Sequence, residues 1–198
     1  MRTKRLIGLV VGLVLSCLCS TMVYADEVED VVKEAMEFYK QGDYSSAAGN
    51  LEYAAQLIRQ KKGGQLESIL PKALPGWTAE DASSQAMGAA MFGGGVTAER
   101  SFAKGDSRVT VQIVTDSPML QGLMMLFSNP AYAMADGGKL ERINGQKAIV
   151  KYGESGRDGD IKMIIANRFL VSVEGSQVSK DDLKAYAKGI DLKKLSSL

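Results

Sequence analysis

The chain has 198 residues, of which 45% are hydrophobic and 24% charged, with 24 basic residues against 23 acidic ones. This length and apolar content predict one domain, or a small helical unit followed by a larger domain, and exclude a disordered chain. The balanced charge, without an obvious basic block, argues against nucleic-acid binding. The sequence has no histidine, which removes the commonest general base and a common zinc or copper ligand.

Residues 1–25 are predicted to be a secretory signal peptide. Arg2, Lys4 and Arg5 precede an apolar run from Leu6 to Leu15, and Val23-Tyr24-Ala25 is an A-x-A-like cleavage site. A basic start, a short apolar run and a small-residue cleavage site are typical of exported proteins. The sequence therefore predicts cleavage after Ala25 and a periplasmic location.

Two alternatives to this interpretation stay open. Residues 14–17 read Val-Leu-Ser-Cys, and acylation of Cys17 in this lipobox-like stretch would make the protein a lipoprotein. Retention of the apolar run as a membrane helix is less favoured, because the run is short and interrupted by glycines. Cleavage after Ala25 removes both cysteines, so we expect a mature chain without thiols or disulfides that is not an integral membrane protein.

Residues 26–62 predict two antiparallel helices joined at Gly42-Asp43. Apolar residues recur at steps of three and four in both segments, and Lys61-Lys62-Gly63-Gly64 predicts the end of the second helix. The pair resembles one tetratricopeptide repeat, although an ordinary helical hairpin explains the same residues. The resemblance rests on the spacing of Phe38, Gly42, Tyr44, Ala47, Leu51 and Ala54. Candidate partner-binding residues are Tyr39, Tyr44 and Tyr53.

A short amphipathic segment from Gln65 to Leu74, interrupted by Pro71, leads into the second part of the chain. Leu74-Pro75-Gly76-Trp77 follows, and Pro-Gly predicts a turn. Trp77 is the only tryptophan. It is interpreted first as a core anchor at the start of the domain, and alternatively as part of a ligand site.

The uncharged stretch from Ser83 to Gly95 is rich in glycine and methionine and predicts a loop. Such a loop can be a linker, or it can cover a ligand site formed by Trp77, Met87, Met91, Phe92 and Met124. Methionine thioethers can also bind Cu(I). Because neither histidine nor a mature-chain cysteine is present to complete such a site, we expect no metal and no cofactor.

The remaining chain predicts an antiparallel sheet with two helices. Strands are expected at Val96–Phe102 and Val109–Thr115, a helix after Asp116-Ser117-Pro118, and further strands between Lys139 and Gly175. Asn144-Gly145 is a strong signal for a hairpin turn. A last helix begins at Ser179, and residues 191–198 are expected to be a short tail. Charged residues alternate with apolar ones on these strands, as on a solvated face, and indicate no catalytic pair.

These elements predict an α+β fold. Residues 75–198 form an antiparallel β-sheet with helices packed mainly on one face, and residues 26–74 form an α-helical hairpin with a short helix. In element order the domain resembles the Mog1/PsbP-like proteins. It is also similar to uncharacterised exported bacterial proteins that begin this domain at Leu-Pro-Gly-Trp and end on a tail like Ile190–Leu195. The resemblance implies a non-enzymatic binding or accessory role.

Two functions are therefore expected, in order of preference. The first is docking to another envelope protein through the helical hairpin or an exposed sheet face. The second is carriage of a small apolar ligand or lipid between sheet and helix, under the methionine-rich loop. A hydrolase is a distant third, because it needs a Ser–Lys or carboxylate pair that spacing does not reveal.

Overall fold

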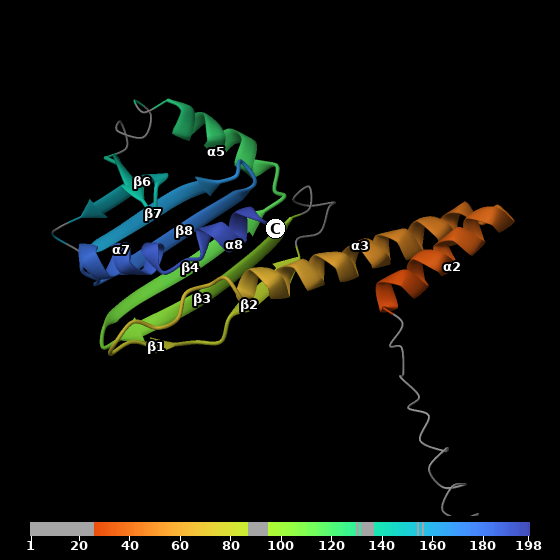
Figure 1. Ribbon diagram of the computed structural model, residues 1–198, viewed down its shortest axis with the longest axis horizontal. Coiled ribbons are helices and arrows are strands. Elements are labelled where there is room, and N and C mark those ends of the chain that lie inside the picture. The colour runs from red at the N-terminus through yellow and green to blue at the C-terminus, as the bar shows by residue number, and fades with distance from the viewer. Residues whose placement is uncertain (1–25, 87–94, 130, 132–136, 154, 156) are drawn as a thin grey trace, which may run out of the picture. The chain divides into compact units, whose positions relative to one another are not determined.

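The computed structural model describes residues 26–86, 95–129, 131, 137–153, 155 and 157–198 (Figure 1). The predicted signal peptide and the predicted site residues Met87, Met91 and Phe92 lie outside the described residues. The chain forms two compact units, one up to Asn50 and one from Leu51 onward. Each unit is described by itself.

The N-terminal unit contains helix α2 (Glu27–Gln41) and the first turns of α3 (Tyr44–Glu67). Asp26 caps α2, and Gly42 ends it in a left-handed conformation with φ of 82°. Asp43 then caps α3, because its carboxylate accepts hydrogen bonds from the backbone N–H and the hydroxyl of Ser46 at 3.1 and 2.7 Å. The predicted helix–Gly-Asp–helix arrangement is confirmed, and it follows from these caps.

The predicted end of the second helix at Gly63-Gly64 is wrong, since α3 continues to Glu67. The glycine at position 63 is explained by a close approach between α3 and strand β2 (Ser83–Ala86). A Cβ on Gly63 would lie 2.5 Å from Ser84 Oγ and 2.9 Å from Ser84 Cβ, so only glycine fits there without a shift. Gly63 therefore allows the sheet domain to pack against this helix, and it does not end the helix.

The C-terminal unit is built on one antiparallel sheet with the strand order β1-β3-β4-β8-β7-β6-β5, and β2 also pairs with β3 (Figure 1). The prediction of an α+β fold, with a helix pair followed by an antiparallel sheet, is confirmed. Part of the expected loop is instead a strand, because Ser83–Ala86 pairs with β3. The strands are β1 (Thr78–Ala79), β2, β3 (Val96–Lys104), β4 (Ser107–Thr115), β5 (Lys139–Ile143), β6 (Gln146–Gly153), β7 (Asp158–Ile165) and β8 (Phe169–Ser176).

Period-two alternation divides the sheet into a buried face and a second face. On β4, Val109, Val111 and Ile113 are at most 1% exposed, whereas the residues between them are partly exposed. The register continues this pattern across β8 and β7, where Val111, Val173 and Ile161 form one buried row. These aligned apolar rows are the core of the domain.

Helix α7 (Lys180–Lys188) packs on the buried face, where it contacts β4, β5, β7 and β8 (Figure 1). The predicted start at Ser179 is confirmed, because the Ser179 hydroxyl accepts a hydrogen bond from the backbone N–H of Asp182 at 3.1 Å. Tyr186 is completely buried on this helix and contacts Trp77 edge-on, with ring centroids 5.3 Å apart. Desolvation raises the pKa of Tyr186 above its ordinary value.

The C-terminal tail is not loose, and its prediction as a simple tail is wrong. Residues Leu192–Ser196 form helix α8, capped by Asp191, and α8 contacts β7. Leu195 is completely buried and Leu192 is 7% exposed, and both belong to the core. Two leucines three residues apart lie on one side of a helix, which explains how so short a segment reaches the core.

Helix α5 (Met119–Ser128) connects β4 with β5. It begins just after Asp116-Ser117-Pro118, as predicted, and ends at Ser128. Asp116, in a left-handed conformation with φ of 57°, forms an ion pair with Lys62 of α3. Side chains of α5 lie beside the second face of the sheet, opposite α7 and α8, and this position creates the pocket described next.

Candidate functional site

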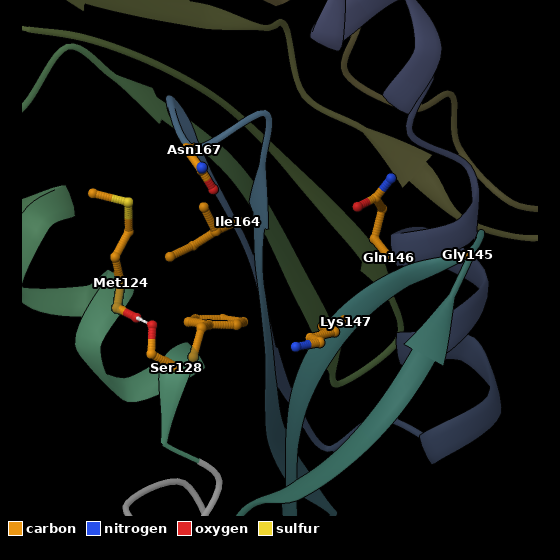
Figure 2. Close-up of a pocket in the computed structure, with 8 residues that line it drawn as sticks. Met124, Ser128, Gly145, Gln146, Lys147, Ile164 and Asn167 are labelled. Carbon is orange, nitrogen blue, oxygen red and sulfur yellow. Dashed lines mark hydrogen bonds between the residues drawn. The ribbon is translucent and has the colours of Figure 1, made fainter.

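The candidate site is a pocket of about 430 Å³ between α5 and the ends of β6 and β7 (Figure 2). Its volume is within the range of about 300–1,000 Å³ that is usual for small-molecule sites. The pocket combines apolar and polar groups on separate elements. Its lining residues are Met124, Phe127, Ser128, Gly145, Gln146, Lys147, Ile164 and Asn167.

Two tight turns shape the strand side of this pocket. Asn144 and Gly145 both have positive φ, at 48° and 80°, so the hairpin turn predicted between β5 and β6 is confirmed. Ala166 and Asn167 in the β7–β8 turn also have positive φ, at 51° and 53°. Because both turns are at the same end of the sheet, they bring the start of β6 and the end of β7 to one place.

Strand alternation decides which side chains reach the pocket. Ile165 and Ala148 belong to the buried face, so their neighbours Ile164 and Lys147 point to the other face, where α5 lies. In Figure 2 the Lys147 side chain extends from β6 toward Ile164 and α5, whereas Gln146 points away from them. Among the described residues that line the pocket, Lys147 is the only charged one.

A second basic residue lies beside Lys147. The hairpin register places Arg142 directly opposite Lys147 on the same face of the β5–β6 pair. The Arg142 guanidinium donates a hydrogen bond to the carbonyl oxygen of Gly145 at 3.1 Å, and Gly145 lines the pocket. Neither basic side chain forms an ion pair with a carboxylate in the described part of the chain. Like charges opposite each other on two strands are destabilising, so this pair favours a bound anion.

The opposite wall of the pocket is apolar. Met124 and Phe127 are three residues apart on α5, so they lie on one side of the helix, and both are partly exposed where they line the pocket. Ile164 of β7 completes this wall. The Ser128 hydroxyl donates a hydrogen bond to the Met124 carbonyl at 2.8 Å and so adds little polarity to it. The pocket therefore has one apolar wall and one basic rim.

The structure separates the residues predicted to bind a ligand. Met124 lines the pocket, whereas Trp77 is 7% exposed, belongs to the core and contacts Tyr186. Sequence reasoning missed Arg142, Lys147 and Phe127. A usable signal existed for the basic pair, because the two-residue Asn144-Gly145 turn sets the register that places Arg142 opposite Lys147.

The predicted partner-binding tyrosines are on the surface. In the N-terminal unit, Tyr39 and Tyr44 are 66% and 67% exposed, and their ring centroids are 5.6 Å apart. Met36 precedes Tyr39 by three residues on α2 and is also exposed. Tyr53, which belongs to the other unit, is 45% exposed. We call Met36, Tyr39 and Tyr44 the aromatic patch.

The charged residues of the strands are not all on a solvated face, which corrects the prediction. Arg100 lies on the buried face of β3, where its guanidinium donates to the Pro71 carbonyl at 3.3 Å. The Glu141 carboxylate forms ion pairs with Lys184 and Lys180 of α7, with Nζ–oxygen distances of 2.5 and 3.4 Å. The hydrogen bond from Lys184 lowers the pKa of Glu141 below its ordinary value, against a smaller opposing effect of desolvation. These contacts join β3 and β5 to segments that pack against them.

A polar hollow lies elsewhere on the second face, lined by residues that include Lys151, Asp160, Lys162 and Glu174. Lys162 Nζ and Asp160 Oδ2 form an ion pair at 3.2 Å, so these two charges compensate each other. Among the described residues, no group of three or more carboxylates, histidines or cysteines is placed to hold a metal ion. The same residues include no helix that is both long and apolar enough to cross a membrane.

Comparison with known proteins found no matching family model, no similar curated protein and no matching solved structure.

Proposed function

We propose that this protein is an exported, non-enzymatic binding or accessory protein that docks another envelope protein through the aromatic patch. The observation that carries the proposal is the exposure of two neighbouring tyrosines, at 66% and 67%, with rings 5.6 Å apart. Tyrosine is enriched at protein interfaces, because its ring supplies a large contact area and its hydroxyl can hydrogen-bond. Neighbouring exposed apolar side chains, unlike single ones, are typical of protein interaction sites.

Two further observations support this proposal. The basic residues, the apolar run and the A-x-A-like site ending at Ala25 favour export to the periplasm. The sheet, with α5 in the chain between β4 and β5 and with α7 and α8 after β8, favours a Mog1/PsbP-like domain, with α7 and α8 on one face. Domains of that kind serve mainly in binding, which agrees with a docking protein.

The docking proposal is tested with the full chain in the periplasm. A photo-crosslinking amino acid at Tyr39 is expected to capture one discrete protein, and the same label at Leu140, an exposed residue of the sheet domain, is expected not to capture it. The double variant Tyr39→Ala, Tyr44→Ala should lose co-purification of that protein while keeping its helix content. Unchanged co-purification by the double variant would refute docking through the aromatic patch.

A second function is favoured by a separate observation. The pocket beside α5 has an apolar wall that includes the predicted residue Met124, which supports carriage of a small apolar ligand. Native mass spectrometry of the protein from a periplasm, compared with its denatured mass, tests this function. A native mass that exceeds the denatured mass by a ligand, and an excess that the Met124→Ser variant loses, are the expected results. Equal masses for the native and denatured protein would argue against a carrier.

A further inference from the structure

We propose that the pocket beside α5 binds a single-chain amphiphile with a carboxylate head, such as a fatty acid, and that Lys147 and Arg142 hold the head. This inference rests on the second function proposed above and names the class of its ligand. The argument uses the charge of the rim, the chemistry of the wall and the size of the pocket.

The two basic residues at the rim favour a head group with a negative charge. Lys147 is the only charged residue in the described lining of the pocket, and Arg142 lies directly opposite it in the register of β5 and β6. No carboxylate of the described residues compensates the two charges. An anion between them would remove their mutual repulsion and accept charge-assisted hydrogen bonds. A cationic head would add a third positive charge at the same place.

The wall selects the rest of the ligand. Met124, Phe127 and Ile164 offer carbon and sulfur surface with no charge, and such a surface gains free energy when an alkyl chain covers it. Methionine suits this task because its flexible thioether adapts to an irregular chain. A purely polar anion such as inorganic phosphate would leave this wall exposed to water.

Beyond the pocket, the same face of the sheet presents Leu140 as an exposed apolar side chain beside Ile149, which is itself buried at 6% exposure. Ile149 follows Lys147 by two residues on β6, so both side chains are on this face, and Leu140 of β5 pairs with Ile149. Leu140 is 38% exposed. A volume of about 430 Å³ is at the lower end of the usual range for ligand sites, which suits one acyl chain better than the two chains of a phospholipid.

The experiment measures binding of three probes by titration calorimetry, each below its micelle concentration. Dodecanoate carries the proposed head, dodecan-1-ol has the same chain without charge, and dodecyltrimethylammonium has a cationic head. The variants are Lys147→Gln, Arg142→Gln and Ile164→Thr, with Lys193→Gln as the control because Lys193 is an exposed lysine of α8 that does not line the pocket.

We expect dodecanoate to bind more tightly than dodecan-1-ol, and dodecyltrimethylammonium to bind weakest. Lys147→Gln and Arg142→Gln should each weaken dodecanoate binding by about three- to tenfold, as for loss of one hydrogen bond at a solvent-exposed site, and leave dodecan-1-ol binding unchanged. Ile164→Thr should weaken both probes, because it removes apolar surface from the wall. Lys193→Gln should change neither affinity.

Each contrary result has a distinct meaning. Equal binding of dodecanoate and dodecan-1-ol would overturn the carboxylate head and leave the carrier function in place. Binding of neither probe would overturn the carrier function itself. Equal effects of Lys147→Gln and Lys193→Gln, or no effect of Ile164→Thr, would overturn the assignment of this pocket.

Discussion

Gly159 and Gly175 face each other on β7 and β8, under Leu183 of α7, and substitution of Gly159 by alanine tests how closely this helix and the strands pack. A Cβ at position 159 would lie 2.7 Å from the carbonyl oxygen of Lys151 and 2.8 Å from Cδ2 of Tyr152. The carbonyl belongs to the backbone of β6, which pairs with β7 beside this position, so it cannot swing aside as a flexible side chain can. Relief requires a shift of the strand itself.

Overpacking of a core typically costs about 1–3 kcal/mol, whereas alanine in a strand gains about 0.5–1 kcal/mol over glycine in chain entropy. We therefore expect Gly159→Ala to lower the free energy of unfolding by about 1–2 kcal/mol. For a chain of this size, that loss lowers the melting temperature by roughly 2–8 °C.

The assay is thermal unfolding followed by circular dichroism, with urea unfolding as an independent measure of the same free energy. Gly122→Ala is the matched control, because a Cβ at Gly122 on α5 meets no atom of the described residues within 4 Å and alanine favours a helix. The control should be as stable as the wild type or more so. A Gly159→Ala variant at least as stable as the wild type would refute the close packing of these strands.

Three further predictions concern stability. Leu195→Ala is expected to lower the free energy of urea unfolding by about 2–5 kcal/mol, whereas exposed Ser197→Ala stays within about 0.5 kcal/mol; equal values would contradict burial of α8. Gly145→Ala forces alanine into φ of 80° with free space around it, so urea unfolding should show a loss of about 1–2 kcal/mol, and no loss would contradict the turn. The pKa of Glu141 is lowered in the folded state, so Glu141→Gln should be less stable than the wild type above pH 4.5, and the difference should disappear as the pH falls through the lowered pKa. A difference that grows toward low pH in the same unfolding experiments would refute that sign.

The local elements could be predicted because their signals lie within a few residues of each other. Gly42-Asp43 supplies both a helix end and the next helix start, and Asn144-Gly145 can adopt the positive φ values of a tight hairpin. Alternation with period two marks the strands, since a strand has one buried face. The start of α7 at Ser179 was also predicted correctly, because a helix N-cap is a local signal.

Packing between distant segments decided the rest. Gly63 looks like a helix end in sequence, and only the approach of Ser84 explains a glycine inside α3. In the sequence, Leu192 and Leu195 are part of an apparent tail. In the structure they are buried, because their helix α8 packs against β7. The pocket also depends on tertiary structure, because α5 must lie beside the face of the sheet that carries Lys147 and Ile164. Sequence by itself determined the strands, turns and caps, because backbone geometry is a local property. Tertiary structure decided which apolar and charged residues meet, because those contacts join segments that no local pattern relates.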